Sequence, residues 1–230
     1  MVLAWPANGK NKTLRMSVLL MALMVFSGSA FGGDIRIGIG QEFASVISPE
    51  NGRLKGELSQ AYNCLINGSG YRVQFVVLPL ARLINELRVG NVDVGLPLVH
   101  DPSRDSFATF GDTVFGSSYL RVSWPTNTAQ PDGDDVRYAY IRGFAGKTML
   151  KDLEGPTFAV SEWDQAIEML RRGRADYVLI TEKTFGAMTA DSDEEFVVER
   201  VRDLDVGFYV SNRSPELLQA MNDANARCRD

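Results

Sequence analysis

Residues 71–96 read YRVQFVVLPLARLINELRVGNVDVGL, and this stretch decides the fold. Its first part, Tyr71–Leu78, is rich in Val and Phe and predicts a strand. Apolar residues at helical spacing from Leu80 to Leu87 then predict a helix that ends at Gly90. A second apolar run, Val92–Leu96, predicts the next strand. The short connections imply parallel strands with right-handed crossovers.

The same alternation continues upstream of this stretch. Ile35–Ile39 predicts a first strand. Apolar residues at helical spacing predict a helix over Leu54–Ile66 that ends before Gly68. Together with residues 71–96 these segments form a β-α-β-α-β unit, which places the chain in the α/β class.

A second unit of this kind follows residues 125–135, whose Pro, Gly, Asp and Asn are typical of a surface linker. The expected elements are strands at 136–141, 157–160 and 177–180 and helices at 146–153 and 163–170. Leu87–Asp93 and Leu170–Asp176 share the pattern Leu-Arg-x-Gly-x-x-Asp. We interpret it as structural, with Gly stopping a helix and Asp opening a buried strand. Two such lobes leave a cleft at the carboxyl ends of their strands, where small ligands favour binding.

The end of the chain completes this organisation. Residues 195–200 and 206–210 predict two further strands. The last helix is expected to open at Ser214-Pro215-Glu216, with Ser214 as its N-cap.

The N-terminal residues have the pattern of an export signal. Lys10, Lys12 and Arg15 precede an apolar run at 16–26, and small residues follow. The run is short for a membrane span, although an uncleaved anchor is the alternative. Cleavage fits after Ala30 or after Gly32. Removing a signal peptide over 1–32 takes away three basic and no acidic residues from a chain of net charge −5, and leaves 198 residues with a net charge of −8. An acidic, exported protein is a poor candidate for nucleic-acid binding.

Cysteine and histidine usage limits the chemistry. Cys64 and Cys228 both lie beside the apolar stripes of predicted helices. In an oxidising compartment they either pair or remain buried thiols. His100 is the single histidine, and no metal-binding, nucleophile or phosphate-binding motif accompanies it. We therefore expect no metal, no cofactor and no enzymatic activity.

Several motifs, in their order and spacing, resemble the periplasmic solute-binding proteins of the amino-acid-binding (family 3) kind, which serve ABC importers. They are Leu54-x-Gly56, Pro79-Leu-Ala-Arg82, Leu87-x-x-Gly90-x-x-Asp93, Asp101-Pro-Ser-Arg104 leading into Phe110–Phe115, and Ala166-x-x-x-Leu170-x-x-Gly173-x-Ala-Asp176. The resemblance runs from Ile35 to the last helix. It implies a two-lobed type II periplasmic-binding-protein fold with a hinge and an interlobe cleft. Lobe one would hold 34–122 plus 206–230, and lobe two 123–205. The family places the last helix on lobe one, which favours a Cys64–Cys228 bridge.

The resemblance also assigns candidate ligand contacts. Arg104 matches the arginine that grips the ligand carboxylate, and a planar guanidinium suits that task. The alternative is a solvated loop arginine. Phe43 matches an aromatic wall and Leu80 an apolar one, although Phe43 as core packing is almost equally favoured.

Other positions depart from the family pattern. Asp101 replaces its threonine, where an acid would oppose an anion, and Leu96, Pro97 and Val99 replace serines that contact the ligand. The lobe-two turn is Gly143-Phe144-Ala145-Gly146, which keeps backbone amides for an anion but lacks hydroxyls. The acid that receives a ligand ammonium falls at Thr181. Glu182 follows it, either as a substitute or as a surface charge.

The predicted pocket is therefore more apolar than the family's. It combines Phe43, Leu80, Phe144 and Tyr119 with Arg104, and Val99 stands beside the arginine motif. Arg82 and Arg142 either add positive charge or are solvated.

The leading hypothesis is a monomeric periplasmic protein that captures a small carboxylate-bearing solute by lobe closure, for an ABC permease or a sensor ectodomain. One alternative is a degenerate solute-binding fold that acts as a periplasmic partner or accessory protein. Another is an enzyme, such as a dehydratase with Glu182 or Glu42 as its base.

Overall fold

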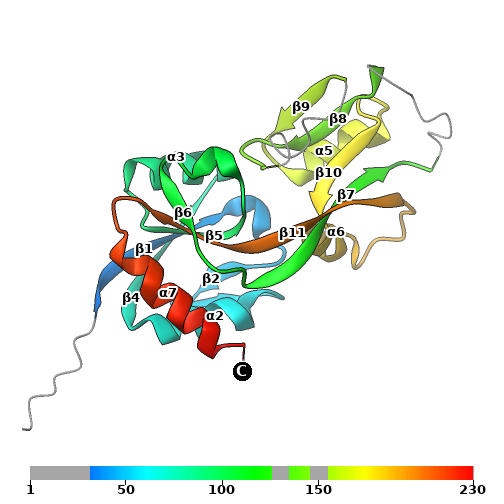
Figure 1. Ribbon diagram of the computed structural model, residues 1–230. Helices are drawn as coiled ribbons and strands as arrows, with labels where there is room; N and C mark the ends of the chain where they lie inside the picture. The colour runs from blue at the N-terminus through cyan, green and yellow to red at the C-terminus, as the bar shows by residue number, and fades with distance from the viewer. Residues whose placement is uncertain (1–31, 126–134, 146–154, 230) are drawn as a thin grey trace, which may run out of the picture. The chain divides into compact units, whose positions relative to one another are not determined.

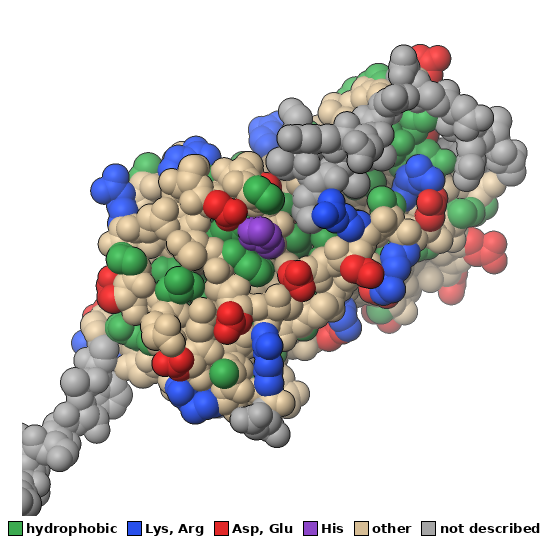
Figure 2. All heavy atoms as spheres, in the orientation of Figure 1, with side chains coloured by type: hydrophobic (Ala, Val, Ile, Leu, Met, Phe, Trp, Pro, Cys, Tyr) green, Lys and Arg blue, Asp and Glu red, His purple; other side chains and the backbone are tan. Residues whose placement is uncertain are grey.

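The computed structural model describes residues 32–125, 135–145 and 155–229 (Figure 1). The predicted helix over 146–153 lies outside these ranges, as does nearly all of the predicted export segment and linker. Within the described ranges no helix is long and apolar enough to cross a membrane. Acidic and basic side chains are interspersed on the face drawn in Figure 2.

Strand β1 (Gly32–Gly40) lies between two parallel neighbours, β4 (Tyr71–Leu78) and β5 (Val94–Val99). Helix α3 (Leu80–Val89) packs on these strands and ends at Gly90, whose φ of 78° is the left-handed conformation expected of a C-cap glycine. The β-α-β-α-β prediction is confirmed, although β5 begins and ends later than expected.

The predicted helix over Leu54–Ile66 is wrong at both ends, because the helix starts later and runs through Gly68 to a C-cap at Gly70. Leu54 lies instead in β3 (Arg53–Lys55), which forms an antiparallel hairpin with β2 (Ser48–Glu50), and α2 spans Ser59–Ser69. The turn is Asn51-Gly52, and both residues have positive φ. Asn-Gly is the preferred dipeptide for such two-residue hairpins, so this local signal outweighs the helical spacing of the apolar residues.

The second half of the sheet has the predicted elements. β8 (Tyr138–Ile141) pairs in parallel with β9 (Thr157–Val160) and β10 (Tyr177–Thr181), and α5 (Trp163–Arg171) packs on all three strands. α6 (Glu182–Thr189) follows β10 directly.

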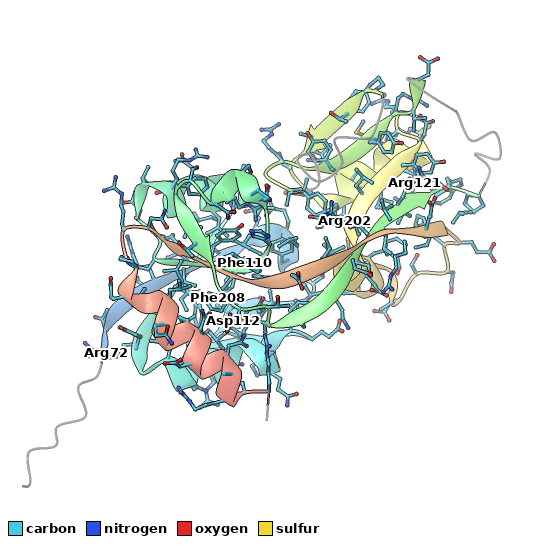
Figure 3. The ribbon with its side chains drawn as sticks, in the orientation of Figure 1. Arg72, Phe110, Asp112, Arg121, Arg202 and Phe208 are labelled. Atoms are coloured by element: carbon cyan, nitrogen blue, oxygen red, sulfur yellow. A yellow bond between two sulfur atoms is a disulfide. The ribbon has the colours of Figure 1, made fainter. Side chains whose placement is uncertain are left out.

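Two long antiparallel strands, β7 (Phe115–Ser123) and β11 (Val197–Ser211), join the halves (Figures 1 and 3). The C-terminal part of β11, Val206–Val210, pairs with β5, and β7 pairs with β10. The strand order of the sheet is therefore β4-β1-β5-β11-β7-β10-β8-β9. β6 (Ala108–Phe110) also pairs with β11.

This topology gives a two-lobed α/β fold in which β7 and β11 form the hinge. The residue boundaries of the lobes remain predictions. The two strands expected at 195–200 and 206–210 are one continuous strand of 15 residues. Residues 202–205, between the two predicted strands, also pair with β7, so the strand continues through them. The pairing has a register irregularity between Arg200 and Arg202.

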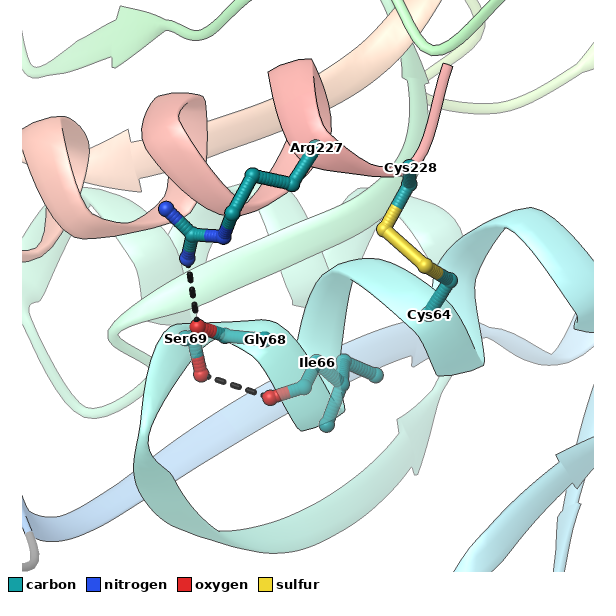
Figure 4. The surroundings of a disulfide bond; sticks show 6 residues. All are labelled: Cys64, Ile66, Gly68, Ser69, Arg227 and Cys228. Atoms are coloured by element: carbon teal, nitrogen blue, oxygen red, sulfur yellow. Dashed lines mark hydrogen bonds between the residues drawn. A yellow bond between two sulfur atoms is a disulfide. The ribbon is translucent and has the colours of Figure 1, made fainter. Parts of the chain in front are cut away.

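Helix α7 (Glu216–Arg227) packs beside α2, and a Cys64–Cys228 disulfide joins them (Figure 4). The two Cα atoms are 6.0 Å apart. Arg227 Nη2 also donates a hydrogen bond of 2.9 Å to the carbonyl oxygen of Gly68. The predicted pairing is confirmed, and the last helix is tied to the first.

The repeated Leu-Arg-x-Gly-x-x-Asp pattern has the same structural role in both lobes. The carboxylate of Asp93 accepts a 2.8 Å bond from the Arg36 N–H, and that of Asp176 accepts a 2.8 Å bond from the Arg137 N–H. The predicted Ser214 N-cap is wrong, because its hydroxyl donates to Asp93 Oδ1 at 2.7 Å and the helix begins at Glu216.

Candidate functional site

A cavity of about 40 Å³, here called the interlobe cavity, lies between the lobes beside β7. At roughly 10–15 Å³ for a water molecule, it has room for about three. Its lining is mainly apolar and comprises Phe43, Val46, Leu58, Leu80, Pro97, Leu98, Val99, Arg104, Phe115, Ser117, Tyr119, Phe144, Ala145, Thr181, Lys183, Thr184 and Val206.

The structure brings most of the predicted site residues to this cavity. They are Phe43, Leu80, Val99, Arg104, Phe144 and Thr181, together with Tyr119. Gly143 does not line this cavity, but its backbone carbonyl accepts a hydrogen bond from Arg104. Glu182 does not line the cavity: its carboxylate is half exposed and lies 3.4 Å from the guanidinium of Arg200.

Arg104 ends a short 3-10 turn, Pro102–Arg104, which the side chain of Asp101 caps by accepting the Ser103 N–H at 3.0 Å. Arg104 is only 4% exposed, so its interpretation as a solvated loop arginine is wrong. Nη1 donates to the Val99 carbonyl at 3.0 Å, and Nη2 donates to the Gly143 carbonyl in the other lobe at 3.2 Å.

The surroundings of Arg104 balance its charge. Burial lowers the pKa of Arg104, and the nearby Asp101 carboxylate opposes that shift. Oδ2 of Asp101 lies 3.9 Å from the Nε of Arg104. The guanidinium stays protonated at neutral pH because an arginine is not deprotonated in proteins. The cavity therefore contains a fixed, desolvated cation.

Three aromatic rings cluster at the cavity, two of them on lining residues. The rings of Tyr119 and Phe144 have centroids 4.6 Å apart, and Phe144 meets Trp163 edge-on at 5.9 Å. The indole N–H of Trp163 donates to the carbonyl of Glu42 in lobe one at 3.0 Å.

Two further contacts join the lobes around the cavity. Lys183 Nζ lies 2.6 Å from Glu57 Oε1. Gly143, at a φ of 87°, approaches helix α3 so closely that a Cβ atom would stand 2.8 Å from the Cα of Ala81.

Ser117 and Lys183 are lining residues that the sequence reasoning missed. Side chains on one face of a strand alternate with period two, so Phe115, Ser117 and Tyr119 share a face of β7. That alternation would have added Ser117 once Tyr119 was a candidate. Of the other basic candidates, Arg82 is exposed beside Glu86, and Arg142 lines a second groove that Arg104 and Phe144 also line.

Acidic and histidine side chains have other roles around the site. The Glu42 carboxylate accepts the Leu80 N–H at the start of α3, and burial raises the pKa of Glu42. His100 is at the surface, purple in Figure 2, and its Nε2 lies 3.3 Å from Asp105 Oδ2. Across the described part of the chain no three His, Cys, Asp or Glu side chains gather as a metal site would require.

Similarity to known proteins is structural. No family model and no curated protein sequence matches the chain. A mutant of the arginine-binding protein ArgBP from T. maritima superposes with a TM-score of 0.71 at 20% identity, covering 86% of this chain and 90% of that one. An ancestral amino acid-binding protein, a precursor of cyclohexadienyl dehydratase, superposes with a TM-score of 0.69 at 20% identity over 86% and 90% of the two chains. The substrate binding protein of an amino acid ABC transporter gives 0.69 at 16% identity over 86% and 93%.

Proposed function

We propose that this chain, whose fold is that of the two-lobed amino-acid-binding proteins, binds a small carboxylate-bearing solute between its lobes. The observation that carries the proposal is Arg104, a buried cation on the wall of an otherwise apolar interlobe cavity. A guanidinium offers five N–H donors in a planar fork, and backbone carbonyls accept from two of its nitrogens. A carboxylate is the anion that matches this fork.

Lobe motion is part of the proposed mechanism. Typical small-molecule sites measure about 300–1,000 Å³, so a cavity of about 40 Å³ must widen to admit a solute. β7 and β11 are the two strands about which the lobes would rotate. The Arg104 bond to Gly143 couples the cation to the opposite lobe, so a carboxylate on Arg104 would bias closure.

The proposed setting is the periplasm, with delivery of the solute to an ABC permease or to a membrane sensor. The N-terminal export pattern and the similarity to the substrate binding protein of an amino acid ABC transporter support it. We propose binding by a monomer, without cofactor or turnover. Neither Glu182 nor Glu42, the bases considered for a dehydratase, lines the interlobe cavity.

Titration calorimetry of the exported protein with a panel of small carboxylates tests the proposal. Arg104→Ala should weaken binding at least about 30-fold, since truncating one partner of a buried charge pair costs about 2–5 kcal/mol. Arg104→Lys keeps a cation but loses the planar fork of donors, so it should also weaken binding. This variant provides the test if Arg104→Ala fails to fold. Arg82→Ala, an exposed arginine of α3, is the matched control and should bind as wild type does. Unchanged affinity in a folded Arg104 variant would contradict the assignment.

A second candidate is a partner or accessory protein built on this fold. Two observations favour it: the cavity is small, and the Arg104 guanidinium already donates hydrogen bonds to the carbonyls of Val99 and Gly143 without any ligand. A thermal-shift screen run beside a pull-down from periplasmic extract separates the two candidates. A carboxylate that stabilises the wild type but not Arg104→Lys supports solute binding, whereas a retained partner without any ligand shift supports the second candidate.

A further inference from the structure

Strand β7 carries two buried hydroxyls on residues that line the interlobe cavity. Ser117 Oγ and Tyr119 Oη both belong to lining residues, and both are shielded from solvent. Neither makes a hydrogen bond within the residues that the structure describes. Buried hydroxyls are nearly always satisfied, and one without a partner destabilises a fold. Two such groups on one wall of one cavity indicate a partner that enters the cavity.

The hydroxyls are held in place. Tyr119 is 0% exposed, its ring is packed 4.6 Å from that of Phe144, and its backbone pairs with Thr181 in β10. Ser117 lies two residues earlier on the same face of the strand. Arg104 lines the same cavity. A ligand carboxylate on Arg104 would therefore leave its remaining polar atoms near the hydroxyls.

Among the described residues, the acids near the cavity already have partners of their own. No Asp or Glu is among the described residues that line it. Asp101 lies against Arg104, Glu57 against Lys183, and Glu42 accepts the Leu80 N–H. An ammonium placed beside Arg104 and Lys183 would be a buried charge without a counter-charge, which is strongly unfavourable.

We infer that the solute is a small apolar carboxylic acid that carries an uncharged oxygen, as a hydroxy or keto acid does, and has no ammonium group. The inference rests on the proposed function, since Arg104 takes the carboxylate. Ser117 and Tyr119 hydrogen-bond the uncharged oxygen, and the apolar and aromatic walls enclose the carbon skeleton.

Two matched ligand series test this inference by calorimetry. Each keeps one skeleton, isobutyl or benzyl, and offers the plain acid, the 2-hydroxy acid, the 2-keto acid and the 2-amino acid. In at least one series the oxygenated acids should bind about tenfold tighter than the plain acid, and the amino acid should bind weakest.

Single variants then assign the contact. Tyr119→Phe and Ser117→Ala should each reduce the affinity for the oxygenated acid about five- to tenfold and leave that for the plain acid unchanged. Ser118→Ala is the control: this hydroxyl belongs to the next residue of β7 and donates to Asp203 Oδ1 at 3.4 Å, so affinities should stay at wild-type values.

The outcomes separate this inference from the proposed function. If amino acids bind most tightly, or if both variants leave every affinity unchanged, the inference is overturned while carboxylate binding stands. If no acid binds, and mass spectrometry finds no carboxylic acid released from the purified protein, both fail. A released hydroxy or keto acid whose affinity falls in Tyr119→Phe supports both.

Discussion

Tyr119 shows at the residue scale how a group proposed to bind the solute lowers the stability of the ligand-free fold. Tyr119 lines the interlobe cavity, and its hydroxyl is buried without a hydrogen-bond partner among the described residues. Burial raises the pKa of Tyr119 well above the ordinary value. Removing the oxygen takes away an unsatisfied polar group while the ring keeps its packing on Phe144. We expect Tyr119→Phe to raise the free energy of unfolding by about 1 kcal/mol in denaturant titrations without added ligand.

Tyr62 provides the matched control for this prediction. It is also fully buried, but its hydroxyl donates a 2.8 Å bond to the carbonyl of Gly207. Tyr62→Phe should lower the free energy of unfolding by about 1 kcal/mol, because it removes this buried hydrogen bond. A loss of stability in Tyr119→Phe as large as that in Tyr62→Phe would show that the Tyr119 hydroxyl has a structural partner.

The candidate site was only partly predictable from individual residues. The motif around Arg104 and its place after β5 predicted a lining residue, and burial now excludes the solvated alternative. Ser117 follows from Tyr119 only once β7 is known to be a strand whose Tyr119 face meets a cavity, and the sequence alone does not show which face that is. That depends on how β7 pairs with both β10 and β11, which is a long-range property of the sheet.

Elements were predicted best where one local signal acted alone. The spacing of apolar residues placed α3 and α5, and both lie where expected. Leu54 had two competing signals, helical spacing and the Asn51-Gly52 turn, and the turn prevailed. The sequence predicts two strands in place of β11 because Arg202, Asp203 and Asp205 interrupt the apolar residues between them. The continuity of β11 comes from pairing with β7, which no local pattern records.

Asp176 lies between the end of α5 and the start of β10, and its contribution to the free energy of unfolding should depend on pH. Its carboxylate accepts bonds from the Arg137 guanidinium and backbone N–H, which hold the pKa of Asp176 below its usual range. A carboxylate whose pKa is lower in the folded than in the unfolded state stabilises the fold at pH values above its unfolded pKa. This stabilisation is lost as the pH falls below about 3.8, the ordinary pKa of an aspartate. Asp176→Asn should lower the free energy of unfolding by about 1–3 kcal/mol at pH 7 and by less toward pH 2.

Urea titrations across this pH range provide the measurement for Asp176. The control is Asp34→Asn, because the ion pair of Asp34 with Arg72 is exposed on both sides and should contribute under about 1 kcal/mol. Arg72 is labelled in Figure 3. A difference between wild type and Asp176→Asn that stays constant down to pH 2 would contradict the role of the carboxylate charge.

The pairing of α2 with α7 is covalent as well as apolar. Cys64 and Cys228 are 164 residues apart in sequence, so the bridge closes most of the described chain into one loop. The double variant Cys64→Ala/Cys228→Ala should lose about 2–4 kcal/mol of unfolding free energy, less than the entropic value for so long a loop. Reduction should lower the stability of the wild type and leave the double variant unchanged. Equal stability of the oxidised wild type and the variant would refute a stabilising bridge.

At the scale of the whole molecule, the two lobes meet through a few close contacts around the interlobe cavity. The Gly143 carbonyl accepts from Arg104, the Trp163 indole donates to the Glu42 carbonyl, and Lys183 pairs with Glu57. These contacts join the lobes beside the cavity, while β7 and β11 are continuous across both lobes. Such a balance favours rotation of the lobes about the two strands over separation of the sheet.

Gly143 tests whether lobe contact controls binding. A methyl group there would stand 2.8 Å from the backbone of Ala81 and prevent the close approach of the lobes. Gly173 is the matched control: it also has a positive φ, 60° against 87°, but a Cβ atom would meet nothing within 4 Å. Both alanine variants should lose about 1 kcal/mol of stability to the left-handed backbone. Only Gly143→Ala should enlarge the radius of gyration in X-ray scattering and weaken carboxylate binding about tenfold. Equal scattering and equal affinity in the two variants would mean that closure at Gly143 is not coupled to the site.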